Sequence, residues 1–116
     1  MKVKNSFKVH SRIWISTEDG NYLGEGRVFL LKGIQEYKSI SKAAKSMEMS
    51  YKKAWNMVNT MNTISNSPLV TRTIGGAGGG GSKVTEAGMK AIELFNEIKT
   101  SNKIHLESKI DQIDFS

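Results

Sequence analysis

The chain has 116 residues, enough for one domain with a modest hydrophobic core but short for two. Apolar residues make up 38% and charged residues 24%, which is typical of a soluble globular protein, and no apolar run approaches the ~18 residues of a membrane span. There is no cysteine, which excludes disulfides and thiolate metal sites, and no apolar segment follows the basic start, so we expect a cytoplasmic protein without a secretory signal.

The formal net charge is +6, and it is unevenly distributed along the chain. Residues 1–83 carry 13 Lys and Arg against 5 Asp and Glu, whereas residues 84–116 carry 4 against 6. A basic body with a mildly acidic tail is typical of a nucleic-acid-binding protein whose last element has another role. A basic surface that only maintains solubility would give the same totals, so charge alone leaves both interpretations open.

A strand and a helix are the first elements expected. Apolar and polar residues alternate over residues 7–16, which predicts a half-buried strand, ended by a turn at 17–21. Residues 24–39 then predict helix one. Its inward face is expected to hold Val28, Phe29, Leu30, Leu31, Ile34, Gln35 and Tyr37.

Residues 41–65 predict a helix-turn-helix. Ser41 is expected to cap a short helix in which Ala43 and Ala44 face inward. Ser50 caps a longer second helix, whose buried positions recur at the spacing of a helical face: Ala54, Val58 and Met61. Its opposite face would enter a DNA major groove and carries Lys52, Trp55, Asn56 and Asn59.

Six of the eleven glycines fall between residues 75 and 81. A phosphate-binding loop would end in Gly-Lys-Ser or Gly-Lys-Thr, but here serine precedes lysine, and the strand–helix–strand context is missing. A flexible linker is disfavoured because the chain is too short for two domains. The glycines lie between two β-prone runs, 69–74 and 82–85, so we interpret residues 68–85 as a β-hairpin wing with Arg72 and Lys83 at its shoulders.

Thr85 is expected to cap a last helix that spans about residues 85–113. Met89, Ile92, Phe95 and Ile98 fall on one side, a polar break is expected at 100–103, and an apolar stripe continues at Leu106, Ile110 and Ile113. That stripe is too short to be stable alone, so it predicts a partner, and a homodimer through this helix is expected.

No arrangement of residues indicates catalysis. His10 and His105 lie in separate elements without acidic clusters, and no serine, histidine and carboxylate converge. The methionines are spaced as core residues of helices. We therefore expect a non-enzyme, with no metal, no cofactor and no membrane contact.

Four stretches together resemble the DNA-binding domain of ModE-type molybdate-responsive regulators. They are GEGRVFLLKGI (24–34), SISKAAKSMEMSYKKAW (39–55), MN (61–62) and PLVTRTIGGAGGGGSKVTEAG (68–88). The likeness runs from about Gly24 to Phe95, and the SYKKAW and GGAGGGG elements are specific in combination. The start of the chain looks like that of short, single-domain members, and LysR-type regulators are more distantly similar.

The resemblance implies a winged-helix transcription regulator that binds double-stranded DNA as a dimer. It assigns DNA contact to the start of the second helix and to the wing. Together with the residue pattern described above, this gives the following candidate DNA-contacting residues: Ser41, Ser50, Tyr51, Lys52, Lys53, Trp55, Asn56, Asn59, Arg72, Thr73, Gly75, Gly76, Gly78, Gly79 and Lys83. Full-length regulators of this type continue into oxyanion-binding domains for which residues 1–116 have no room, so no small-molecule effector is expected.

These observations predict a single domain over residues 1–116. Its class is mainly α with a small β-wing: a winged helix-turn-helix plus an N-terminal strand and a C-terminal dimerisation helix. The expected function is sequence-specific transcription regulation linked to molybdenum or metal homeostasis. The alternative is a winged-helix protein-interaction module whose basic face meets an acidic partner.

Overall fold

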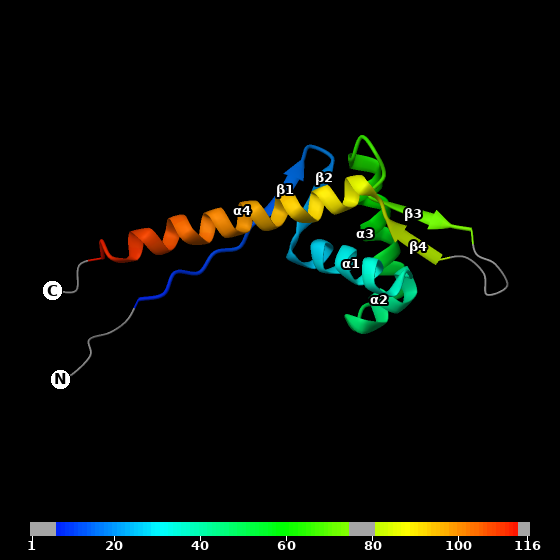
Figure 1. Cartoon of the computed structure of the whole chain (residues 1–116), viewed down its shortest axis with the longest axis horizontal. Coiled ribbons are helices and arrows are strands. Elements are labelled where there is room, and N and C mark those ends of the chain that lie inside the picture. The colour runs from blue at the N-terminus through cyan, green and yellow to red at the C-terminus, as the bar shows by residue number, and fades with distance from the viewer. Residues whose placement is uncertain (1–6, 75–80, 114–116) are drawn as a thin grey trace.

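A computed structural model describes residues 7–74 and 81–113. The elements are, in chain order, β1 (Trp14–Thr17), β2 (Gly20–Gly24), α1 (Glu25–Tyr37), α2 (Ile40–Ser46), α3 (Tyr51–Ile64), β3 (Val70–Thr73), β4 (Gly81–Val84) and α4 (Glu86–Ile110). Three helices, a hairpin and a long final helix form a winged helix-turn-helix, with α4 projecting away from the body (Figure 1). The predicted fold class is confirmed.

The N-terminal strand is shorter than predicted and belongs to a hairpin. β1 begins at Trp14 and pairs antiparallel with β2, with Trp14 opposite Gly24 and a bulge after Ile15. Residues 7–13 do not form a strand, although their alternating pattern predicted one. A strand needs a neighbour for its backbone groups, and β2 reaches only the last part of the pattern.

The apolar face of α1 is narrower than predicted. Val28, Leu30, Leu31 and Ile34 are buried, but Phe29 and Tyr37 are 62% and 41% exposed, and Gln35 is exposed as well. These three residues were wrongly expected to lie on the inward face. The core includes residues of α1, α2, α3, β2, β3 and α4, and Phe29, Gln35 and Tyr37 lie outside it.

The first helix of the helix-turn-helix begins two residues earlier than predicted. Ser39, not Ser41, caps α2, since the Ser39 hydroxyl oxygen accepts a hydrogen bond from the Lys42 N–H at 3.1 Å. Ala43 and Ala44 are buried as expected, and a Cβ placed on Gly33 would lie 3.1 Å from the Cβ of Ala43. This close approach fixes α2 against α1.

Asn62 fastens α3 to the start of the wing. Its side-chain oxygen accepts hydrogen bonds from the Leu69 and Val70 N–H groups at 2.8 and 3.2 Å, and its amide nitrogen donates to the Val70 carbonyl at 2.9 Å. At the other strand, the Thr85 hydroxyl donates to the Pro68 carbonyl at 2.7 Å. These contacts hold the base of the β3–β4 hairpin.

α4 is one continuous helix, so the break predicted at residues 100–103 is wrong. Thr85 caps it as expected, through a bond from the Gly88 N–H at 3.0 Å. Ile92 and Phe95 are buried, whereas Met89 and Ile98, which were placed on the same side, are 41% and 36% exposed.

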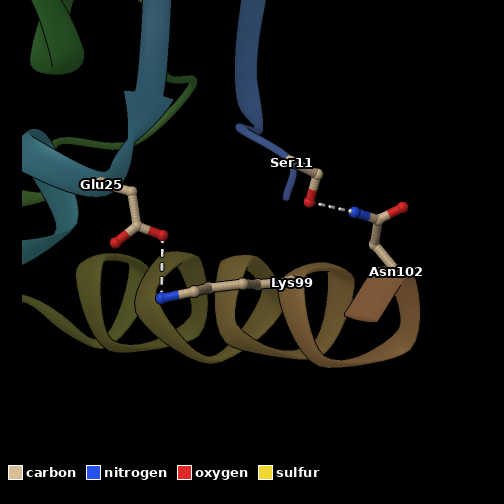
Figure 2. A network of polar contacts seen from close by, with 4 residues as sticks. All are labelled: Ser11, Glu25, Lys99 and Asn102. Atoms are coloured by element: carbon tan, nitrogen blue, oxygen red, sulfur yellow. Dashed lines mark hydrogen bonds and ion pairs between the residues drawn. The ribbon is translucent and has the colours of Figure 1, made fainter. Parts of the chain in front are cut away.

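Two polar contacts hold the middle of α4 against the rest of the chain (Figure 2). Lys99 forms an ion pair with Glu25 of α1 at 2.8 Å, and the Asn102 amide donates to the Ser11 hydroxyl at 3.0 Å. Both partners of the ion pair are more than half exposed, so it stabilises the fold by at most about 1 kcal/mol. The residues that precede β1 also line a cavity with Leu106 and Ile110, which are half-buried. The N-terminal residues therefore cover part of the apolar stripe that was predicted at the end of α4.

Replacing Asn62 with alanine is expected to destabilise the fold by about 2–3 kcal/mol, because three hydrogen bonds to the hairpin are lost and two backbone N–H groups lose their acceptor. Urea unfolding followed by circular dichroism measures the change. Asn66→Ala is the matched control, since Asn66 is exposed, and should change stability by less than about 0.5 kcal/mol. Equal effects of the two substitutions would contradict the assigned role of Asn62.

Candidate nucleic-acid interface

The start of α3 is a capped and electropositive helix end. The Ser50 hydroxyl oxygen accepts a hydrogen bond from the Lys53 N–H at 3.1 Å, as predicted. The first turn contains Lys52 and Lys53 and no acidic residue. Because a helix N-terminus carries a partial positive charge, these lysines add to an existing field that attracts anions.

The outer face of α3 offers unengaged polar side chains. Ala54, Val58 and Met61 are buried against the core, which leaves Lys52, Asn56 and Asn59 exposed on the opposite side. The hydroxyls of Thr60 and Thr63 donate instead to backbone carbonyls one turn earlier. Within residues 7–74 and 81–113 the two asparagine amides have no hydrogen-bond partner, so both are available to a ligand.

A cleft of about 290 Å³ separates α2 and α3 from the wing. It brings together five predicted residues from distant parts of the sequence: Ser41, Tyr51, Trp55, Arg72 and Thr73. Tyr51 and Trp55 are 50% and 44% exposed, so their rings are only partly covered by the protein. Trp55, predicted on the outer face of the second helix, lies at the wall of this cleft.

The two strands of the wing carry their basic residues on different faces. Arg72 pairs with Ser82 across the hairpin and lines the cleft, whereas Lys83 pairs with Thr71 and does not. Side chains that pair directly lie on the same face of a sheet, while neighbours along a strand alternate. The cleft thus gathers Arg72 but not Lys83.

Thr73 has a role within the hairpin. Its hydroxyl oxygen accepts a hydrogen bond from the Gly81 N–H at 2.9 Å, so this side chain closes the wing at the last described pair of residues. The predicted contacts at Gly75, Gly76, Gly78 and Gly79 lie outside the described residues.

The wing is attached to the corner between α1 and α2. The Ser82 N–H donates to the Lys38 carbonyl at 3.0 Å, and a Cβ at Gly81 would lie 2.5 Å from that same oxygen. Lys38 itself has a left-handed backbone conformation, with φ of 55°, and ends α1. Only glycine at residue 81 permits this approach.

Sequence reasoning missed Arg27. This residue lies on α1 and lines a depression of about 310 Å³ together with Ser50, Lys52, Lys53 and Asn56. Helix one was considered only for its apolar face, so its polar positions were not assigned. The available signal was that Arg27, a basic residue, directly precedes Val28, which was predicted to face inward.

No helix in the described part of the chain is long and apolar enough to cross a membrane. Among the same residues, no cluster of three or more His, Cys, Asp or Glu side chains could hold a metal ion.

No protein-family model matches the chain. It is 34% identical to the molybdenum transport protein ModE of Azotobacter vinelandii over 103 residues, 89% of this chain and 37% of that protein. It is 47% identical to the transcriptional regulator ModE of Yersinia pestis over 74 residues, 64% of this chain and 28% of that protein. The DNA-binding transcriptional dual regulator ModE of Escherichia coli K12 is 46% identical over 70 residues, 60% of this chain and 27% of that protein.

Other relatives, in Rhodobacter capsulatus, are named molybdenum-pterin-binding proteins. The chain spans little more than a third, or less, of the length of the ModE proteins it matches. The ModE proteins of Yersinia pestis and Escherichia coli are named as transcriptional regulators, which supports the expected regulatory class. The resemblance predicted from the sequence motifs is confirmed.

Gly81→Ala is expected to push β4 away from the Lys38 carbonyl and to destabilise the fold by about 1–3 kcal/mol. Amide hydrogen exchange at Ser82, which loses its acceptor, should accelerate. Gly26→Ala is the matched control, because a Cβ there meets nothing within 4 Å, and it should stabilise α1 by about 0.5–1 kcal/mol. Unchanged exchange at Ser82 in Gly81→Ala would show that the wing does not depend on this contact.

Proposed function

We propose that this chain, which is of the ModE N-terminal DNA-binding domain type, is a sequence-specific DNA-binding regulator of transcription that acts in the cytoplasm. The observation that carries the proposal is the exposed face of α3. It combines an electropositive helix start with free amide side chains, next to a cleft that holds Arg72. That combination provides both charge attraction and base-specific hydrogen bonding.

The dimensions of α3 suit a major groove. Its 14 residues form a rod about 21 Å long, and the major groove of B-DNA, about 12 Å wide, admits a helix. Asn56 and Asn59 lie three residues apart, so both amides face the same way. An asparagine amide pairs bidentately with adenine, which would make these residues the sequence-reading groups.

The basic and aromatic residues around this face would hold the phosphates. Lys52 and Lys53 extend from the positive end of α3, and Arg72 extends from the wing into the cleft. Phosphate contacts fix the register of a protein on DNA but carry no sequence information. Tyr51 and Trp55, half exposed at the same cleft, would pack against the sugar-phosphate backbone.

Some relatives are named for molybdenum transport or molybdenum-pterin binding, which supports a molybdenum link for the regulated genes. In this proposal, the genes that the protein controls are the ones related to molybdenum.

The first experiment titrates the chain against a random duplex and a duplex selected from a randomised pool, by fluorescence anisotropy at several salt concentrations. The selected duplex should bind tighter, with a steep salt dependence. Lys52→Ala should weaken binding to both duplexes and reduce the salt slope by about 0.9. Asn56→Ala should cost about 1–3 kcal/mol on the selected duplex only. Equal, weak binding to both duplexes would overturn the proposal and favour an acidic protein partner for the basic face.

We also propose that two copies pair through α4. Leu94 and Ile98 lie one turn apart on this helix and are 52% and 36% exposed, on a flank that the core does not cover. A second copy offers the same apolar flank, so pairing buries both at once. This flank replaces the stripe at Leu106 and Ile110, which the N-terminal residues partly cover.

A double substitution, Leu94→Gln with Ile98→Gln, is expected to shift the chain from dimer to monomer in sedimentation velocity. Ile104→Gln is the control, because Ile104 is 63% exposed on the same helix but about a quarter turn away. Dissociation by the control alone would place the interface on another face, and a monomeric wild-type chain would exclude the dimer.

A further inference from the structure

Arg27 of α1 lies beside the start of α3, in the depression of about 310 Å³ that it shares with Lys52, Lys53 and Asn56. Three cationic side chains from two different helices therefore converge there. None of them is in an ion pair, since Lys99 and Glu25 form the only such pair among residues 7–74 and 81–113. This depression, with its three positive charges, is distinct from the cleft beside the wing.

The two hollows lie on opposite flanks of the exposed face of α3. Tyr51 and Trp55, four residues apart, line the cleft beside the wing. Lys53 and Met57, also four residues apart, line the depression beside Arg27. Residues four apart share one flank of a helix, and these two pairs are separated by more than half a turn. Lys52 and Asn56 lie between them.

A helix in a major groove has a phosphate backbone on each side. In the proposed DNA complex, Arg72 of the wing serves one backbone. The opposite backbone would pass the depression, where Arg27 lies. We propose that Arg27 binds a phosphate on this second backbone and so fixes the orientation of α3 in the groove; this inference rests on the proposed DNA-binding function.

The state of the Arg27 side chain supports this assignment. Its Nε atom is buried and has no hydrogen-bond partner, the only such buried side-chain nitrogen or oxygen found in the described residues. An unsatisfied buried donor costs free energy, and no acceptor within residues 7–74 and 81–113 is bonded to this Nε atom. A phosphate at the rim would give the guanidinium two acceptor oxygens in a matching geometry if the side chain turns outward.

The test compares Arg27→Gln with Lys109→Gln, which removes the same charge from the last turn of α4, far from α3 (Figure 1). Binding of the full chain to the selected duplex is measured from 50 to 200 mM salt. Arg27→Gln should weaken binding roughly tenfold at 50 mM salt. It should also lower the salt slope by about 0.9, so the loss of affinity at 200 mM should be about 3.5-fold smaller than the loss at 50 mM. Lys109→Gln should leave both quantities nearly unchanged.

A second measurement places the contact. Single phosphates of the selected duplex are replaced one at a time by neutral methylphosphonates. Wild-type binding should weaken at several positions, and at one of those on the strand away from the wing Arg27→Gln should lose nothing further. Arg27→Lys keeps the charge but loses the planar guanidinium that binds two phosphate oxygens at once. It should recover part of the affinity, and its binding should weaken again when that phosphate is neutralised. Should Arg27→Gln fail to fold in a thermal melt, Arg27→Lys and the methylphosphonate series still decide the matter.

The inference is overturned if Arg27→Gln behaves like Lys109→Gln while Lys52→Ala still weakens binding; the proposed function would then stand without this contact. It is also overturned if the neutral phosphates act equally on wild type and Arg27→Gln. Absence of duplex binding by the wild-type chain would remove the proposed function and this inference together.

Discussion

The geometry of the interface depends first on a backbone contact between β4 and the corner that joins α1 to α2. At Lys38 the chain leaves α1 in a left-handed conformation, with its N–H bonded to the Ile34 carbonyl at 2.7 Å. This turn directs the Lys38 carbonyl outward, where it accepts the Ser82 N–H. Because Gly81 has no side chain, β4 approaches closely enough to form the bond. The wing is thereby oriented by the same corner that orients α2.

A second attachment lies at the other end of the hairpin, where Asn62 and Thr85 bond to the backbone of residues 68–70. Two separate attachments prevent the hairpin from rotating about either one. The separation between Arg72 and the face of α3 is therefore a property of the folded chain, and a ligand that needs both does not have to order them. Asn62 also shows that a residue of α3 can serve the wing without facing the ligand.

Local patterns in the sequence predicted the parts of the fold that local forces decide. The spacing of Ala54, Val58 and Met61 identified the buried side of α3, and hydroxyl residues identified the caps at Ser50 and Thr85. Ser39 and Ser41 both precede the buried Ala43 and Ala44, so residue type alone does not decide which of them caps α2. Arg27 could not be assigned from one helix, because only the packing of α1 beside α3 brings it next to Lys52.

The site residues likewise divide into those that local sequence identifies and those that only the folded chain brings together. Those on α3 could be assigned from one helix, whereas the cleft that joins Ser41, Tyr51 and Arg72 required the docking of the wing. This docking has a consequence for a paired molecule. Thr85 connects the wing directly to the cap of α4, so pairing of two copies along α4, as we propose, would set the separation of their α3 faces. Two such faces reach one side of B-DNA only when their half-sites are spaced by whole turns of about 10–10.5 base pairs, so α4 would select the spacing of the half-sites while α3 selects their sequence.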